Sequence, residues 1–256
     1  MDSIIRQMEK VESDVKNELR PSLAEIVAAA ELYRRLGKDF TFSGGNGLDK
    51  KVNGILLALS NGILDDIDER IDFAISEAEA EDDSEDIRAY VFRDLGGETA
   101  TDRIDRHVSR MKYVIEAGIA IGFAQKLARN NIVSTLFQLV QNPTYKMLIP
   151  DARRGGGYAA SYITDGDLNS GRGISPNIIK AIGTVGSTMI AEAFHYGKIH
   201  VYARKGAIGY GVQRNSSYDC PDCDEVCSVI HPLTEIVVPV HPHCCCSTYP
   251  IYPDDL

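Results

Sequence analysis

A chain of 256 residues, 44% hydrophobic and 25% charged, has the composition of an ordinary soluble globular protein with room for one large domain or two modest ones. Its net charge is −10, with acidic excess in both halves, which argues against broad electrostatic binding to a nucleic-acid backbone. No apolar stretch is long enough to span a bilayer, and the first residues are charged and periodic rather than signal-like. We therefore expect a protein that is assembled in a reducing cytoplasm and has no membrane partner.

The first 150 residues are predicted to form a helical domain. Apolar residues at three- and four-residue spacing predict a helix over 3–20, and Pro21 is expected to end it and begin a second helix that reaches residue 36. These two helices either pack on each other or offer a face to a partner. A loop follows at 40–47, and the pair Asn61-Gly62 is expected to divide the next apolar pattern into helices over 48–59 and 63–75.

The remainder of this half continues the helical pattern. The acidic run at 76–86 is interpreted as a solvated helix end and linker rather than as a partner-binding segment. Helices are predicted over 101–130 and 132–141, and His107, among charged neighbours, is expected at the surface rather than as a catalytic base.

Residues 151–174 are rich in glycine and are predicted to form a linker. The pair Arg153-Arg154 beside three glycines hints at an anion contact, but a connector is the preferred interpretation. A third segment, 175–256, then begins with a helix that runs to about Gly206, in which Gly183, Gly186 and Ser187 lie on one side and favour close packing. Strands are expected at 207–214 and 235–240. The predicted fold class is α+β, with a mostly helical N-terminal part followed by a small β-containing zinc-knuckle part.

All six cysteines and three of the six histidines lie between residues 218 and 249. Core cysteines would be scattered through a fold, whereas a Cys-x-x-Cys pair followed by a second cluster of His and Cys is typical of a metal site. Buried thiols and disulfides are the alternatives, and disulfides would need an oxidising compartment that nothing else in the chain indicates. We therefore predict a Zn²⁺ site.

The first pair of ligands is Cys220 and Cys223, from one tight turn around Pro221. The second cluster, 239–246, offers more donors than the ion has remaining positions. The preferred set is Cys220, Cys223, His241 and Cys246, with Cys244 as the first substitute; Cys227 is a spare thiol.

The order of these motifs resembles a known family. A helix and a strand precede Asp219-Cys220-x-x-Cys223, and then come Pro239-x-His241-Pro242-x-Cys244-x-Cys246 and the tail Ser-Thr-Tyr-Pro-Ile-Tyr. This order, over about residues 175–252, is similar to the phage head morphogenesis family, the Mu-type minor head proteins of tailed phages. Two features depart from the family pattern: Cys245 stands where the family usually has arginine, and Cys220 follows Asp219 directly.

The resemblance implies a structural virion protein rather than an enzyme. Proteins of that family act in head morphogenesis at the portal vertex or inside the capsid, and some are carried with DNA during ejection. The implied partners are the portal or major capsid protein, with packaged DNA nearby but not strongly bound, and the virion sets the oligomeric state.

Two other classes of function, a zinc enzyme and a zinc-ribbon nucleic-acid binder, are the alternatives. A zinc-dependent hydrolase or effector would use the Cys/His cluster with Asp219, Asp222, Asp224 or Glu225 beside it, but thiolate-rich sites are usually closed and structural. A zinc deaminase is disfavoured because the chain has no His-x-Glu motif, and a zinc-ribbon nucleic-acid binder is disfavoured by the acidic surroundings.

Overall fold

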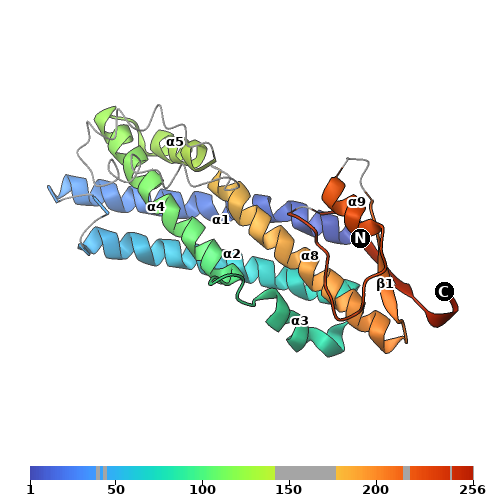
Figure 1. The fold of residues 1–256 in the computed structure, drawn as a ribbon. Coiled ribbons are helices and arrows are strands. Elements are labelled where there is room, and N and C mark those ends of the chain that lie inside the picture. Colours follow the sequence, from blue (N-terminus) through green and yellow to red (C-terminus); the bar gives the residue numbers. More distant parts are fainter. Residues whose placement is uncertain (39–40, 43–44, 142–176, 216–219, 243, 256) are drawn as a thin grey trace. The chain divides into compact units, whose positions relative to one another are not determined.

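The computed structural model describes residues 1–38, 41–42, 45–141, 177–215, 220–242 and 244–255. These residues are mostly helical, with one small antiparallel sheet near the C-terminus, which agrees loosely with the predicted α+β class (Figure 1). The predicted linker at 151–174 and its Arg153-Arg154 pair lie outside the described residues, and the predicted division of the chain around this linker stays a prediction.

Seven α-helices and two strands are described. They are α1 (Asp2–Arg35), α2 (Gly47–Glu77), α3 (Ser84–Val91), α4 (Ala100–Ala124), α5 (Arg129–Gln141), α8 (Ile178–Arg204), β1 (Gly209–Gln213), α9 (Pro221–Cys227) and β2 (Ser247–Ile251). Two short 3₁₀ turns lie at Glu81–Asp83 and Pro253–Asp255. In the part of the chain given above, no helix combines the length and apolarity needed to cross a bilayer.

Residue contacts divide the chain into two compact units, each built from separate segments. Unit 1 comprises Met1–Val11, Asp65–Thr101 and Gly183–Leu256, and unit 2 comprises Glu12–Leu64 and Asp102–Ile182. Helices α1, α2 and α8 each contribute residues to both units. The two units are described separately below.

Helix α1 does not end at Pro21, so the predicted pair of helices is one helix of 34 residues. A proline inside a helix removes one hydrogen bond and usually costs stability. The apolar stripe nevertheless continues across it, since Val15 and Leu19 before the proline and Leu23 and Ile26 after it are all buried. Burial of this continuous stripe in the core of unit 2 outweighs the local cost. The stripe therefore packs within the chain and is not left for a partner.

Helix α2 likewise runs through Asn61-Gly62, where the sequence predicted a break. A Cβ at Gly62 would lie 3.3 Å from a carboxylate oxygen of Glu18, so the missing side chain lets the two helices approach closely. The same apolar stripe continues from Leu59 through Ile63, and both residues are buried. Glycine is here a packing residue rather than a helix breaker.

The core of unit 2 also contains α4 and α5. A Cβ at Gly122 would lie 2.7 Å from Cγ1 of Ile132, and one at Gly118 would meet Leu136, so α5 packs directly on two glycines of α4. The predicted helix over 101–130 ends earlier, at Ala124. His107 is not a surface residue as predicted: it is 5% exposed, and its Nδ1 lies 3.3 Å from Nη1 of Arg110. His107 and its neighbour Val108 are both on the buried side of α4.

Unit 1 is organised around α8. A Cβ at Gly186 would lie 2.8 Å from Ile67 and 2.9 Å from Val11, and the Ser187 hydroxyl donates to the Met8 carbonyl at 3.1 Å, as the run of small residues predicts. On the α3 side, Arg93 forms an ion pair with Glu192 at 3.1 Å. Helix α8 ends where Gly206 takes a positive φ of 82°.

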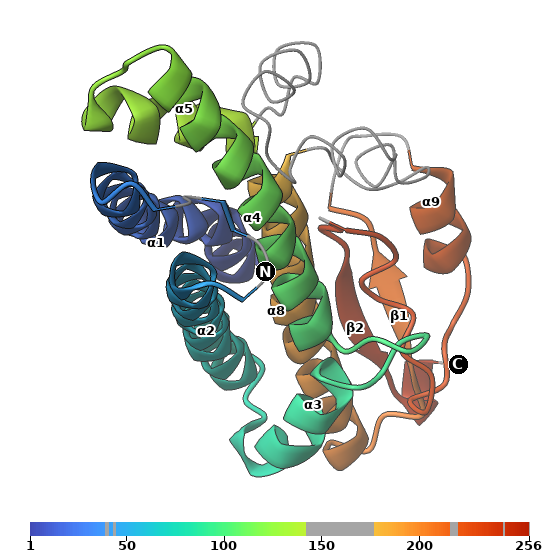
Figure 2. The ribbon, with the colours of Figure 1, turned by 90° about the vertical axis from the view of Figure 1, so that its left-hand side faces the viewer.

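The remainder of unit 1 is the cysteine region, which we define as residues 207–252. Strand β1 pairs antiparallel with β2 in the register Gly209↔Ile251 to Gln213↔Ser247 (Figure 2). The first predicted strand (207–214) is confirmed as β1, and the tail after Cys246 forms β2. The predicted strand at 235–240 is wrong: β1 already has β2 on one edge, and on its other edge Tyr210 exchanges both backbone hydrogen bonds with His231.

Candidate metal centre

Five of the predicted metal-binding side chains come together in the cysteine region. They form two overlapping groups, Cys220–Cys223–His241 and Cys223–Cys244–Cys246, and within each group all ligand atoms lie within 4.8 Å of one another. The first two residues lie at the start of α9, and the other three lie in the irregular segment before β2. The structure therefore contains a buried Cys/His group that can hold a metal ion.

Helix α9 positions the first two thiols. The sequence analysis predicted only a tight turn here, but Cys220 caps a helix whose first residue is Pro221. The Asp224 N–H donates to the Cys220 carbonyl at 3.0 Å, which closes the first helical turn and brings Cys223 beside Cys220. The nearby backbone N–H of Cys223 is the main cause that lowers the pKa of the Cys220 thiol.

His241 faces both of these thiols. Its Nε2 atom lies 3.2 Å from Sγ of Cys220 and 3.2 Å from Sγ of Cys223. Its Nδ1–H donates to the Pro242 carbonyl at 2.9 Å, which leaves the lone pair on Nε2, the atom that faces the thiols. The same hydrogen bond is the largest cause of the raised pKa of His241. A metal ion that approaches the two sulfurs therefore meets a correctly oriented imidazole.

Cys246 and Cys244 continue the cluster on the other side of Cys223. The sulfurs of Cys246 and Cys244 both lie within 4.8 Å of the Cys223 sulfur and of each other. Either thiol can therefore be the fourth ligand, Cys246 as in the preferred set or Cys244 as its substitute.

The inner thiols are almost completely shielded from solvent. Cys223, Cys244 and Cys246 are 3%, 0% and 2% exposed. Burial raises the pKa of Cys223 to about 12, and burial is also the largest cause of the raised pKa of Cys246. A buried thiolate needs a compensating cation. A metal ion can supply this positive charge when it displaces the thiol protons.

The other candidates of this region lie outside both groups. None of the six cysteines forms a disulfide in the structure, so the disulfide alternative is not realised. Cys227 packs against the core as a partly buried thiol, in agreement with its predicted role as a spare, and Cys245 is also partly buried. The His231 Nε2 atom lies 2.8 Å from the Val226 carbonyl, so this histidine supports the backbone. Asp219 and His243 lie outside the described residues.

A small core supports the metal-binding side chains. Ile199 of α8, Tyr210 and Val212 of β1, and Val238 are buried against Cys223, Cys244 and Cys246. The Tyr210 hydroxyl donates to the Glu235 carbonyl at 2.8 Å and accepts from the Val237 N–H at 3.1 Å. Three of the seven buried members of this core are cysteines, so its packing depends on the state of the thiols.

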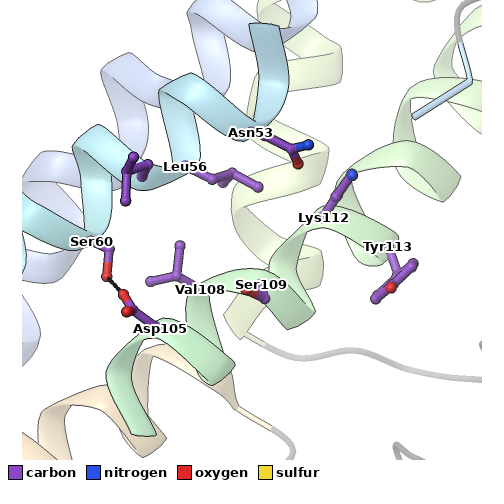
Figure 3. A pocket seen from close by; sticks show the side chains of 9 residues that line it. Asn53, Leu56, Ser60, Asp105, Val108, Ser109, Lys112 and Tyr113 are labelled. Atoms are coloured by element: carbon purple, nitrogen blue, oxygen red, sulfur yellow. Dashed lines mark hydrogen bonds between the residues drawn. The ribbon is translucent and has the colours of Figure 1, made fainter. Parts of the chain in front are cut away.

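Unit 2 contains a pocket between α2 and α4 (Figure 3). It has a volume of about 510 Å³, and Leu56 and Val108 line it together with polar side chains. Its charged groups already have partners within unit 2: Asp105 accepts a hydrogen bond from Ser60, and Lys112 pairs with Asp49. No sequence motif predicted this pocket.

Comparison with known proteins finds no relative of this chain. The chain matches no protein-family model, and it matches neither a curated protein nor a solved structure. The fold and the metal centre are therefore interpreted from the chain's own residues.

Proposed function

We propose that this protein is a structural minor head protein of a tailed phage, associated with the portal or the inner capsid, and that Zn²⁺ stabilises its cysteine region. The observation that carries the proposal is the order of elements around the centre. Helix α8 and strand β1 precede the Cys220–Cys223 pair, and the segment His241–Cys246 leads directly into β2. This is the order on which the resemblance to phage head morphogenesis proteins rests.

The donor set supports zinc as the ion. Three thiolates and one imidazole are a usual tetrahedral zinc set, and Zn–S distances of about 2.3 Å suit thiols that converge on one point. The two overlapping groups together offer five protein donors, and one zinc ion needs four. A closed site of this kind stabilises a fold and leaves no position for a substrate.

The acidic charge supports the proposed location. A net charge of −10 lets a protein share a capsid with DNA without binding strongly to it, because like charges repel. During assembly the protein would be in the host cytoplasm, where thiols stay reduced and available to zinc.

Particle analysis tests the proposal. Virions purified from cells that express the phage genes should contain the protein at low copy number by quantitative mass spectrometry, and tagged protein should co-purify with the portal or major capsid protein. The variant Cys223→Ser should be lost from particles, whereas the matched variant Cys227→Ser, outside both metal-binding groups, should be incorporated normally. Detection in infected-cell lysates but never in particles would refute the proposed function.

Carboxylate variants separate this function from the zinc-hydrolase alternative. The carboxylates next to the centre, Asp222, Asp224 and Glu225, are exposed. A hydrolase would need one of them as a general base beside a zinc-bound water. Asp222→Asn and Glu225→Gln should leave particle incorporation unchanged; loss of a hydrolytic turnover in either variant would instead support an enzyme.

A further inference from the structure

The five donors of the metal centre are arranged as two triads that share one thiol. On one side of Cys223 lie Cys220 and His241, and on the other lie Cys246 and Cys244. One zinc ion with a tetrahedral shell uses four of the five and leaves Cys244 as a buried thiol. The second triad, by contrast, consists entirely of thiols that are at most 3% exposed.

Three soft donors that converge on one point can also fill the whole coordination shell of a Cu(I) ion. Thiolates select soft metals such as Cu(I), and imidazole is a further copper ligand. A monovalent d¹⁰ ion is satisfied by three ligands in a plane, and a thiolate sulfur has enough lone pairs to bridge two ions. The first triad supplies two sulfurs and one nitrogen, and the second supplies three sulfurs.

We propose that the centre has two metal-loading states: one tetrahedral Zn²⁺, or two trigonal Cu(I) ions bridged by the Cys223 sulfur. In the second state one ion binds Cys220, Cys223 and His241, and the other binds Cys223, Cys244 and Cys246. This inference rests on the proposed metal centre but not on the proposed role in the virion.

The exchange between the two states balances. Two Cu(I) ions enter, one Zn²⁺ ion leaves, and the Cys244 thiol releases its proton to solvent; charge is conserved and no atom is oxidised or reduced. Burial of Cys244 and Cys246 keeps water away from the second ion. The three sulfurs already lie within 4.8 Å of one another, so the second ion can bind between them inside the core that includes Tyr210 and Val212.

Anaerobic titration with Cu(I) tests the inference. The full-length zinc protein is titrated with Cu(I) buffered by bicinchoninate, which removes weakly held copper, and native mass spectrometry counts the ions. Wild-type protein should start with one zinc and finish with two copper ions and no zinc. X-ray absorption of the copper form should show three-coordinate sulfur and nitrogen shells and a neighbouring copper atom.

Variants assign the second ion to its triad. Cys244→Ser should keep one zinc but retain one copper ion instead of two. Cys227→Ser and Cys245→Ser are the matched controls, because both thiols lie in the cysteine region but outside both triads, and both variants should retain two copper ions. A wild-type limit of one copper ion, or loss of the second ion in either control, would overturn the inference while leaving the zinc centre intact. Failure to find zinc in the starting protein would instead contradict the proposed zinc centre.

Discussion

Unit 2 and the cysteine region obtain their cores in different ways. In unit 2, long helices with continuous apolar stripes bury residues such as Leu23, Ile63 and Leu136 completely or almost completely. The cysteine region has two strands of five residues and a helix of seven, and three of the seven residues in its buried core are cysteines. A small segment with so little apolar surface needs an additional source of stability. The comparison shows that one chain can contain both a core of apolar side chains and a small core built largely of thiols, for which we propose metal binding as the additional source of stability.

Removal of the metal should give the largest difference between the two regions. Zinc binding at such sites contributes apparent free energies on the order of 10 kcal/mol. Cys223→Ser, or chelation of the wild type, should therefore unfold residues from about 207 onward and leave the helices of unit 2 folded. Hydrogen exchange measured by mass spectrometry should show loss of protection in β1, α9 and β2 only. Equal loss of protection in α4 and α5 would show that the two regions are not independent.

A cavity in unit 2 should give the reverse pattern. Leu136 is fully buried and packs on Gly118, where no side chain can move in to fill a gap. Leu136→Ala should lower the free energy of unfolding by about 2–5 kcal/mol, measured by urea denaturation followed by circular dichroism. The variant should still bind one zinc ion per chain. A loss of zinc in Leu136→Ala would break the comparison from the other side.

A buried histidine in α8, His195, should make the stability of the fold sensitive to acid. His195 is fully buried, and neither ring nitrogen has a hydrogen-bond partner among the described residues. Burial is the main cause that lowers its pKa from 6.5 to about 4, so the folded protein holds it neutral. The unfolded chain binds a proton at higher pH than the folded one, so stability is fully present above pH 6.5 and is lost as the pH falls toward 4.

His195→Leu should remove this part of the acid sensitivity. The largest loss that the wild type can show from this group between pH 6.5 and 4 is about 3 kcal/mol, at 1.36 kcal/mol per pH unit. The variant should be as stable as the wild type or more stable at pH 7, because two unpaired buried nitrogens disappear. Urea denaturation at several pH values measures the difference. Identical pH dependence in the two proteins would show that His195 is not held neutral.

Replacing two lysines of unit 2 should change the free energy of unfolding least, and one of the two replacements is a matched control for the other. The Lys112 and Asp49 side chains are 19% and 11% exposed, and their hydrogen bond is the main cause that holds the Asp49 pKa below its ordinary value. Lys112→Met should cost about 1–3 kcal/mol at neutral pH, because it leaves a shielded carboxylate without its cation.

Lys51→Met removes a similar pair from the surface. Lys51 lies 3.6 Å from Glu25, and their side chains are 50% and 58% exposed. Solvent screens such a pair, so we expect a change within about 0.5 kcal/mol. The effect of Lys112→Met should also shrink as acid protonates Asp49, since a neutral carboxyl group no longer needs the lysine. Equal costs for the two variants at pH 7 would contradict this assignment.

The local rules for proline and glycine predicted helix ends that the structure does not have. Pro21 and the pair Asn61-Gly62 disfavour helix locally, yet α1 and α2 run through them because the apolar stripe continues on both sides. His107 was expected at the surface because its neighbours are charged, but its position on the buried face of α4 decides its exposure. At the proline and the glycine, burial of the stripe outweighs a local preference of about 1–3 kcal/mol against helix.

The sequence alone was sufficient to locate the Cys/His group that can hold a metal ion, because ligand chemistry requires particular residue types at short spacing. Cys220, Cys223, His241, Cys244 and Cys246 are recognisable without any knowledge of packing, and so are the helices whose apolar residues recur regularly. Tertiary structure decided what spacing does not encode: that β2 rather than residues 235–240 pairs with β1, that α9 carries the first two thiols, and that the five donors form two triads sharing Cys223. These features depend on which segments meet in space, and that is set by burial over the whole unit rather than by neighbours along the chain.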